Sequence, residues 1–100
     1  MAGSVANYSS PYASWKNYAT WATNTWLMND EWTESDVVKI VMTSEDKYEI
    51  AERLTDLVRD LCDYEALTPL CQSLVEYFIE DVDFLELAEH YIEDYRQGEI

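Results

Sequence analysis

Glycine and proline are almost absent from this chain of 100 residues. Glycine occurs only at positions 3 and 98, and proline only at positions 11 and 69. Tight hairpin turns usually need glycine, because their central residues adopt positive φ angles. Helices joined by short polar links do not have this requirement. The sequence therefore predicts an all-α protein, a compact single domain of four to five short helices.

Aromatic and apolar residues recur every three or four positions near the start of the chain. The set consists of Trp15, Tyr18, Ala22 and Trp26. Residues at this spacing share one face of a helix, which predicts a helix over residues 15–28. The small and polar residues before it predict a flexible N-terminal arm over residues 1–14. The helical domain would then occupy residues 15–100.

The segment after this helix is rich in β-branched residues and allows two interpretations. Thr33 or Ser35 can cap a helix that continues through residues 37–43. Valine and isoleucine are also frequent in strands, so a strand over residues 37–43 is the alternative to the preferred helix. Ser44, followed by two acidic residues, is a good N-cap for the next helix.

Two later helices have strong start signals. Thr68 precedes Pro69, which predicts a helix over residues 69–80. Asp83 is followed three residues later by Glu86, a capping box that predicts the last helix. In the helix over residues 69–80, the side chains expected to point inward are Leu70, Leu74, Tyr77 and Phe78. The apolar positions of the last helix are Phe84, Leu87, Ala88, Tyr91, Ile92 and Tyr95. In the helix after Ser44 the apolar stripe contains Tyr48, Ala51, Thr55, Val58 and Cys62, with Leu54, Leu57 and Leu61 beside it.

The charge of the chain is strongly negative and unevenly distributed. Twenty-one Asp and Glu against six Lys and Arg give a formal net charge of −15. Residues 60–95 hold eleven acids and no Lys or Arg. Direct binding of nucleic acid or of an anionic membrane requires clustered Lys and Arg, so both are disfavoured. The natural partner of this chain would be basic.

Acidic residues of this base-free segment stack on helix faces. Neighbours three or four residues apart have Cβ atoms about 5–6 Å apart. Phosphates on one DNA strand recur at a comparable scale, about 3.4 Å of helix axis each. The carboxylates could imitate a phosphate backbone and pair with Arg and Lys of a partner. The alternative is a solvated face that keeps the protein soluble. The candidate partner-binding acids are Glu76, Glu80, Asp83, Glu86, Glu89, Glu93 and Asp94.

Four tryptophans lie within residues 15–32. The commoner fate of such residues is to build the core, which is the preferred interpretation. Alternatively, Trp21 and Trp32 point outward as interface anchors, a frequent role of tryptophan in complexes. The same patch could include Tyr8, Tyr12 and Tyr18.

Residue types that carry catalysis or bind metals are scarce. His90 is the only histidine, and no zinc-ligand set, EF-hand loop, phosphate-binding loop or hydrolase motif occurs. Cys62 and Cys71 lack CxxC spacing and are expected to be buried thiols of a reduced, cytosolic protein. The start of the sequence lacks the pattern of a signal peptide, and no run reaches the roughly 18 apolar residues of a membrane helix, so neither segment is expected. The sequence predicts a protein that is not an enzyme and uses no cofactor or metal.

Segments near both ends of the helical domain resemble parts of known sequences. Residues 17–21 read Asn-Tyr-Ala-Thr-Trp, and residues 26–31 read Trp-Leu-Met-Asn-Asp-Glu. They resemble the N-Y-x-T-W … L-W-I-x-N-D-E-like motif of small uncharacterised proteins of phages and other mobile elements, with Met28 in place of the usual isoleucine. Residues 82–94 are similar to the usual ending of that group. The resemblance implies a viral or mobile-element setting but no activity. By charge and setting, the chain also resembles acidic DNA-mimic anti-defence proteins, namely anti-CRISPR and antirestriction proteins.

Two functional hypotheses follow. In the first, the chain is a phage or mobile-element inhibitor of a host defence nuclease complex, either a CRISPR effector or a restriction enzyme. It would act as an acidic nucleic-acid mimic that blocks a basic DNA- or RNA-binding surface. In the second, it is a non-enzymatic helical adaptor that binds a protein partner through its Trp/Tyr-rich N-terminal half. Either function would be exercised in the cytoplasm of the host cell, without direct nucleic-acid or membrane binding, and both are compatible with a homodimer.

Overall fold

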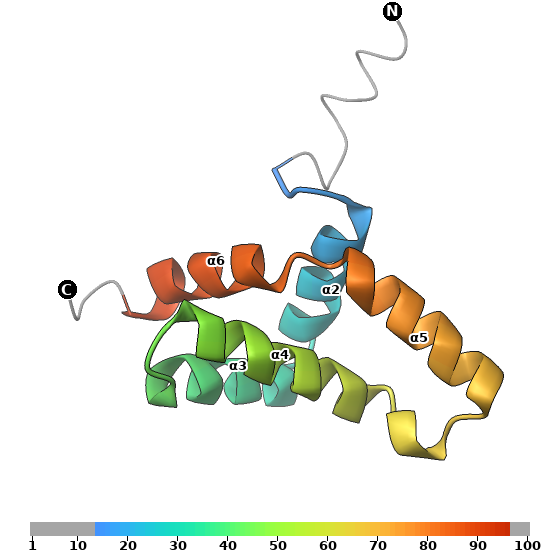
Figure 1. The fold of residues 1–100 in the computed structure, drawn as a ribbon. Helices are drawn as coiled ribbons and strands as arrows, with labels where there is room; N and C mark the ends of the chain where they lie inside the picture. The colour runs from blue at the N-terminus through green and yellow to red at the C-terminus, as the bar shows by residue number, and fades with distance from the viewer. Residues whose placement is uncertain (1–13, 97–100) are drawn as a thin grey trace, which may run out of the picture.

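Five α-helices make up most of residues 14–96, the part of the chain that the computed structural model describes (Figure 1). No strand occurs in this part, and residues 37–43 are helical, so the predicted all-α fold is confirmed. Apart from Ser14, the predicted N-terminal arm lies outside the described residues. The elements are α2 (Tyr18–Met28), α3 (Glu31–Thr43), α4 (Lys47–Leu61), the 3₁₀ helix η1 (Tyr64–Ala66), α5 (Pro69–Asp81) and α6 (Phe84–Arg96).

The N-caps predicted for α5 and α6 are confirmed, but the capping box predicted at Asp83 and Glu86 is only half formed, because the Asp83 N–H donates to the Thr20 hydroxyl and not to the Glu86 carboxylate. The Thr68 hydroxyl accepts a hydrogen bond from the backbone N–H of Cys71, and α5 begins at Pro69. The Asp83 carboxylate accepts a hydrogen bond of 3.0 Å from the backbone N–H of Glu86 in the first turn of α6. Such caps satisfy donors that the first turn of a helix otherwise leaves unpaired.

The start signals predicted for α3 and α4 are wrong. Helix α3 begins after Asp30, whose carboxylate accepts the N–H of Trp32, and not at Thr33 or Ser35. Helix α4 begins after Asp46, and Ser44 instead ends α3 as its C-cap. In both places an aspartate near the predicted serine or threonine takes the cap, since a carboxylate is the stronger acceptor for backbone N–H groups.

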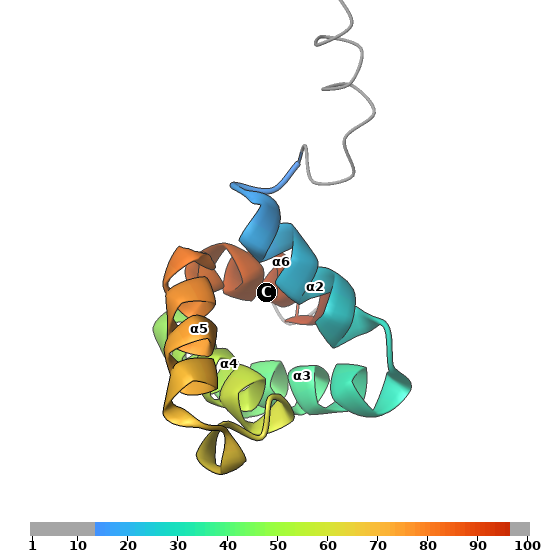
Figure 2. The ribbon, with the colours of Figure 1, turned by 90° about the vertical axis from the view of Figure 1, so that its right-hand side faces the viewer.

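The core lies where α6 packs on α4 and α3, with α2 across one end (Figures 1 and 2). The predicted apolar face of α6 is confirmed, with Phe84, Leu87, Ala88 and Tyr91 buried. Opposite them lie the buried residues Val37, Ile40 and Val41 of α3 and Ile50 and Leu54 of α4. Tyr48, placed on the α4 stripe by its spacing, is exposed, and Ile50 fills the core position at this end of the helix.

Helix α2 is tied to the turn between α5 and α6 by a chain of hydrogen bonds. The Thr20 hydroxyl is fully buried, donates to Asn17 Oδ1 at 2.7 Å and accepts from the backbone N–H of Asp83 at 2.9 Å. Asn17 Nδ2 donates to the carbonyl of Asp81 at 2.7 Å. Residues more than sixty positions apart in sequence are thereby fixed to one another. This joint sets the position of α2 against α5.

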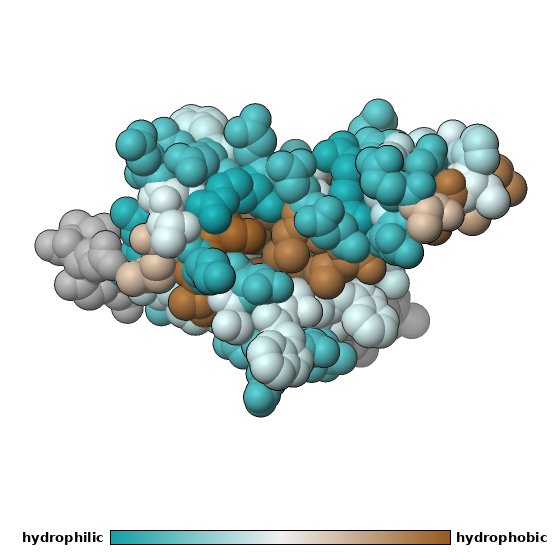
Figure 3. Space-filling model, turned by 90° about the horizontal axis from the view of Figure 1, so that it is seen from below, coloured by the Kyte–Doolittle hydropathy of each residue, from teal (hydrophilic) through white to brown (hydrophobic). Residues whose placement is uncertain are grey.

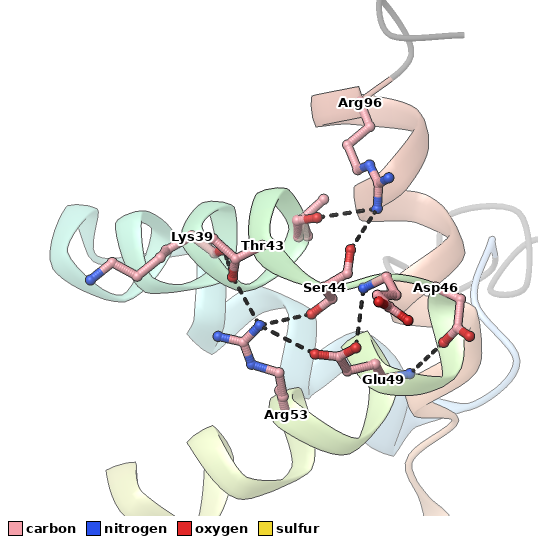
Figure 4. Close-up of polar contacts among 9 residues, drawn as sticks. Lys39, Thr43, Ser44, Asp46, Glu49, Arg53 and Arg96 are labelled. Carbon is pink, nitrogen blue, oxygen red and sulfur yellow. Dashed lines mark hydrogen bonds and ion pairs between the residues drawn. The ribbon is translucent and has the colours of Figure 1, made fainter.

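A second polar cluster fixes the corner between α3 and α4 (Figure 4). Arg53 of α4 reaches back and donates to the hydroxyls of Thr43 and Ser44, both at 2.9 Å. Arg96, in the last turn of α6, donates to the carbonyls of Val41 and Ser44. Carbonyls at the C-terminal end of a helix have no partner within it, so these cations stabilise the end of α3.

One tight turn uses a left-handed residue without glycine. Asp63, between α4 and η1, has a φ of 54°, a conformation that aspartate tolerates better than most residues. Among residues 14–96, no helix has the length and apolar character needed to cross a bilayer.

Candidate functional site

Helix α5 exposes most of its apolar side chains. Leu70, Leu74, Tyr77 and Phe78 are all exposed, Leu70 by 70% and Tyr77 by 78%, so their predicted inward orientation is wrong. Ile79 is buried instead. The physical reason is that α5 is apolar on several faces, while it packs on α2 near its C-terminal end and projects from the bundle toward η1 (Figure 1).

The exposed side of α5 borders a groove of about 600 Å³ between α2, α4 and α5. Figure 3 shows apolar side chains in a hollowed strip across one face of the molecule, with hydrophilic side chains along one side and mainly side chains of intermediate hydropathy along the other. The volume is within the range of about 300–1,000 Å³ that is usual for ligand sites. The groove is lined by Tyr18, Ala22, Thr23, Trp26 and Leu27 from α2, by Val58, Leu61 and Cys62 from the end of α4, and by Leu74, Val75, Phe78 and Ile79 from α5.

The floor and the rim of this groove differ in exposure. Leu27 and Ile79 are buried and belong to the core, so they form the floor. Trp26 is 73% exposed and Leu74 is 60% exposed, and these side chains stand on the rim. The predicted burial of Trp26 in the core is therefore wrong, although it shares a face with Tyr18 and Ala22 as predicted. Exposed aromatic and leucine side chains around an apolar floor are typical of a surface that binds another molecule.

Both cysteines are exposed, contrary to the predicted buried thiols. Cys62 caps the C-terminal end of α4 and lines the groove, and Cys71 lies in the first turn of α5. The C-terminal end of α4 and the N-terminal end of α5 do not pack into the core. The apolar residues near the two cysteines in sequence therefore do not bury their thiols.

An ion pair joins α4 to the middle of α5. Arg59 donates from Nε and Nη2 to the two carboxylate oxygens of Glu76, at 2.8 and 3.0 Å. Gln72 Nε2 donates to the carbonyl of Tyr64 in η1 at 2.9 Å. These contacts hold the projecting part of α5. The hydrogen bonds from Arg59 lower the pKa of the Glu76 carboxyl, and the same hydrogen bonds raise the pKa of Arg59.

The lowered pKa of Glu76 makes its contribution to stability depend on pH. A carboxyl with a depressed folded-state pKa stabilises the protein above its unfolded-state pKa, and this contribution disappears as pH falls through the folded-state value. We expect Glu76→Gln to lower Tm at pH 7, and the difference from wild type to shrink progressively below pH 4.5, the ordinary pKa of the group. Thermal denaturation of both proteins between pH 3 and pH 7 measures it, with Glu80→Gln as control. A Tm difference that is independent of pH would contradict this assignment.

Four of the seven candidate acids are engaged within the chain. Glu76 is held by Arg59, as described, and Glu89 pairs with Lys47 at 2.8 Å. Asp83 caps α6, and its Oδ2 lies 3.5 Å from Lys16 Nζ. The backbone N–H of Lys16 donates to Oε1 of Glu86. The other three have no polar partner among residues 14–96 and remain available to another molecule: Glu80, Glu93 and Asp94. The structure does not gather the seven acids into one uninterrupted patch.

The two candidate tryptophans lie outside the groove lining. Trp32, in the first turn of α3, is 81% exposed, so its predicted placement in the core is wrong and its outward orientation agrees with the anchor alternative. Trp21 is partly buried, and its ring lies 5.5 Å from that of Tyr18. Trp26 is the tryptophan that lines the groove, which sequence reasoning missed. The available signal was its helical spacing from Tyr18 and Ala22. Tyr8 and Tyr12 lie outside the described residues.

The single histidine has a packing role. His90 is partly buried, and its ring lies against that of Trp15, tilted by 34° with the centroids 4.2 Å apart. Within residues 14–96, no group of three or more His, Cys, Asp or Glu is placed to hold a metal ion.

Comparison with known proteins adds no further assignment. No family model matches the chain, and no curated protein or solved structure matches it. The functional argument consequently depends on the chemistry of the groove and of the charged surface.

Proposed function

We propose that this chain is a non-enzymatic protein-binding domain whose apolar groove holds a partner protein. The observation that carries the proposal is the open groove bordered by Trp26, Leu74 and Phe78. Exposed aromatic and large aliphatic side chains lose contact with water on binding, at about 25 cal/mol per Å² of apolar surface. A few such anchors usually supply most of the binding energy of an interface.

The charge of the chain selects the kind of partner. A net charge of −15 repels other acidic proteins and attracts basic ones, which speeds association. Glu80, Glu93 and Asp94 have no partner in the described part of the chain and can pair with Lys or Arg of another protein. The partner we propose is therefore a basic protein, which includes proteins that bind nucleic acids.

A second candidate function is inhibition of a host defence nuclease by nucleic-acid mimicry. The observation that favours it is the run of residues 60–95 without Lys or Arg, which ends in the acidic surface of α6. In this case the carboxylates would occupy the positions of phosphates in a CRISPR effector or a restriction enzyme. The engagement of Glu76, Asp83, Glu86 and Glu89 within the chain makes the groove the stronger candidate.

One capture experiment separates the two functions. The tagged full chain is incubated with a lysate of its native cell, and the retained proteins are compared among variants at rising salt. We expect Trp26→Ser combined with Leu74→Gln to reduce retention of the principal partner by about tenfold or more. The control is Trp32→Ser combined with Tyr77→Gln, which changes side chains outside the groove that are at least as exposed, and this variant should retain the partner.

A charge-reversed variant tests the second candidate function, nucleic-acid mimicry. Glu80→Lys, Glu93→Lys and Asp94→Lys together leave the groove unchanged. A partner that survives the groove variant but is lost with this triple variant, and is displaced by added DNA, would overturn the groove proposal in favour of mimicry. All substituted side chains are exposed, so each change should alter the free energy of unfolding by about 0.5 kcal/mol or less. Circular dichroism checks that every variant is folded.

A further inference from the structure

We infer that the occupant of the groove is an amphipathic α-helix of the partner that carries Lys and Arg beside its apolar face. The inference rests on the proposed protein-binding function and names the element that binds. Three features of the groove support this inference. Its walls are helices, it offers no hydrogen-bond partners to the backbone of an extended peptide, and the charge around it is negative.

The walls of the groove are three helices with apolar side chains one turn apart. Leu74 and Phe78 are four residues apart on α5, and Ala22 and Trp26 are four residues apart on α2. Rows of side chains at this spacing form ridges, and the ridges of a further helix fit between them. The same mode of binding places apolar residues i, i+3, i+4 and i+7 of a peptide helix in a hydrophobic groove.

An extended peptide would be a poor occupant because its backbone would lack hydrogen-bond partners. Residues 14–96 contain no strand and therefore offer no sheet edge that a peptide strand could extend. The Thr23 hydroxyl in the lining already donates to the carbonyl of Ala19 at 2.8 Å. Buried N–H and C=O groups without partners are costly, whereas a helix pairs its own backbone groups.

The surroundings of the groove favour cations on the occupant. The lining contains no charged side chain. Asp60 and Asp63, next to Leu61 and Cys62 in sequence, line a separate hollow at the end of α4 together with Asp56 and Glu65, and Asp81 follows Ile79 by two residues. Of the bases nearest to the lining in sequence, Arg59 is held by Glu76, and Lys16 Nζ lies 3.5 Å from the carboxylate of Asp83. A second copy of this chain is disfavoured as the occupant, because two bodies of charge −15 repel each other.

The two cysteines provide a matched pair of reporters. Cys62 lines the groove and Cys71 does not, and both are exposed. In Cys71→Ser and Cys62→Ser chains, intact-mass spectrometry follows the reaction of the remaining thiol with a neutral maleimide. The probe is a peptide of about 14 residues, roughly four helical turns, made of leucine and lysine with leucine at helical spacing. The comparison peptides are one of the same composition with alternating leucine and lysine, and a helical one with glutamate in place of lysine.

We expect the helical leucine–lysine peptide to slow modification of Cys62 by about tenfold at saturation and to leave Cys71 unchanged. Trp26→Ser with Leu74→Gln should weaken this protection by about tenfold. Equal protection by the alternating peptide would overturn the helical occupant, and equal protection by the glutamate peptide would overturn the basic one. If no peptide protects Cys62 and light scattering shows dimers, the occupant is a second copy. If the peptides fail while the groove variant still loses its captured partner, the proposed function stands and this inference is wrong.

Discussion

Leu54→Ala is expected to lower the free energy of unfolding by about 2–5 kcal/mol, the usual cost of truncating a fully buried leucine. Leu54 has no exposed surface and lies on the face of α4 that packs against α6. Removal of its side-chain carbons leaves a cavity between these two helices, which form the principal contact of the core. Because domains of this size have a total stability of about 5–15 kcal/mol, this loss would be a large fraction of it.

The matched control is Leu61→Ala, which makes the same change seven residues later on the same helix, where the side chain is exposed. It should change stability far less, and urea denaturation of both variants measures the difference. Comparable losses for Leu54→Ala and Leu61→Ala would mean that the core does not lie between α4 and α6.

Thr20→Val is expected to cost about 1–3 kcal/mol, although valine has nearly the shape of threonine. The hydroxyl donates to Asn17 Oδ1 and accepts from the backbone N–H of Asp83. Its removal leaves the Asp83 N–H without this acceptor, while Asn17 Oδ1 keeps the hydrogen bond from the backbone N–H of Thr20. For a domain of about 100 residues, 1 kcal/mol corresponds to roughly 4–8 °C in Tm.

The control for this prediction is Thr25→Val on the same helix. Its hydroxyl is exposed and donates only to the carbonyl of Trp21 within α2. We expect a change in Tm that is small in comparison. If Thr20→Val were as well tolerated as Thr25→Val, the hydrogen bonds of Thr20 would not hold α2 to the turn between α5 and α6.

The parts of the fold that the sequence predicts are those with one clear apolar face or a local start signal. Helix α6 has a single stripe through Leu87 and Tyr91, and Asp83 caps it, so pattern and structure agree. The start of α5 is likewise set by a local signal, the N-cap Thr68 followed by Pro69. Both signals depend on residues close together in sequence.

The face of α5 was not predictable, because spacing alone does not show which of several apolar faces a neighbour covers. Leu70, Leu74 and Phe78 form as regular a row as Val75, Ile79 and Val82, and only the position of α2 decides between them. The pairing of Glu76 has a similar cause. Arg59 lies just outside the base-free run, and it reaches Glu76 only because η1 turns the chain back.

The joint at Thr20 has a consequence for when the protein can act. The groove takes its lining from residues 18–27, 58–62 and 74–79, and the hydrogen bonds that tie α2 to the end of α5 and the turn after it need Asp81 and Asp83 in place. During synthesis, a chain that ends before this turn has the side chains of the groove but not their arrangement. Once the domain has closed, a partner in the groove bridges all three segments. At one hundred times its Kd, such a partner would add about 2.7 kcal/mol to the stability of the whole fold.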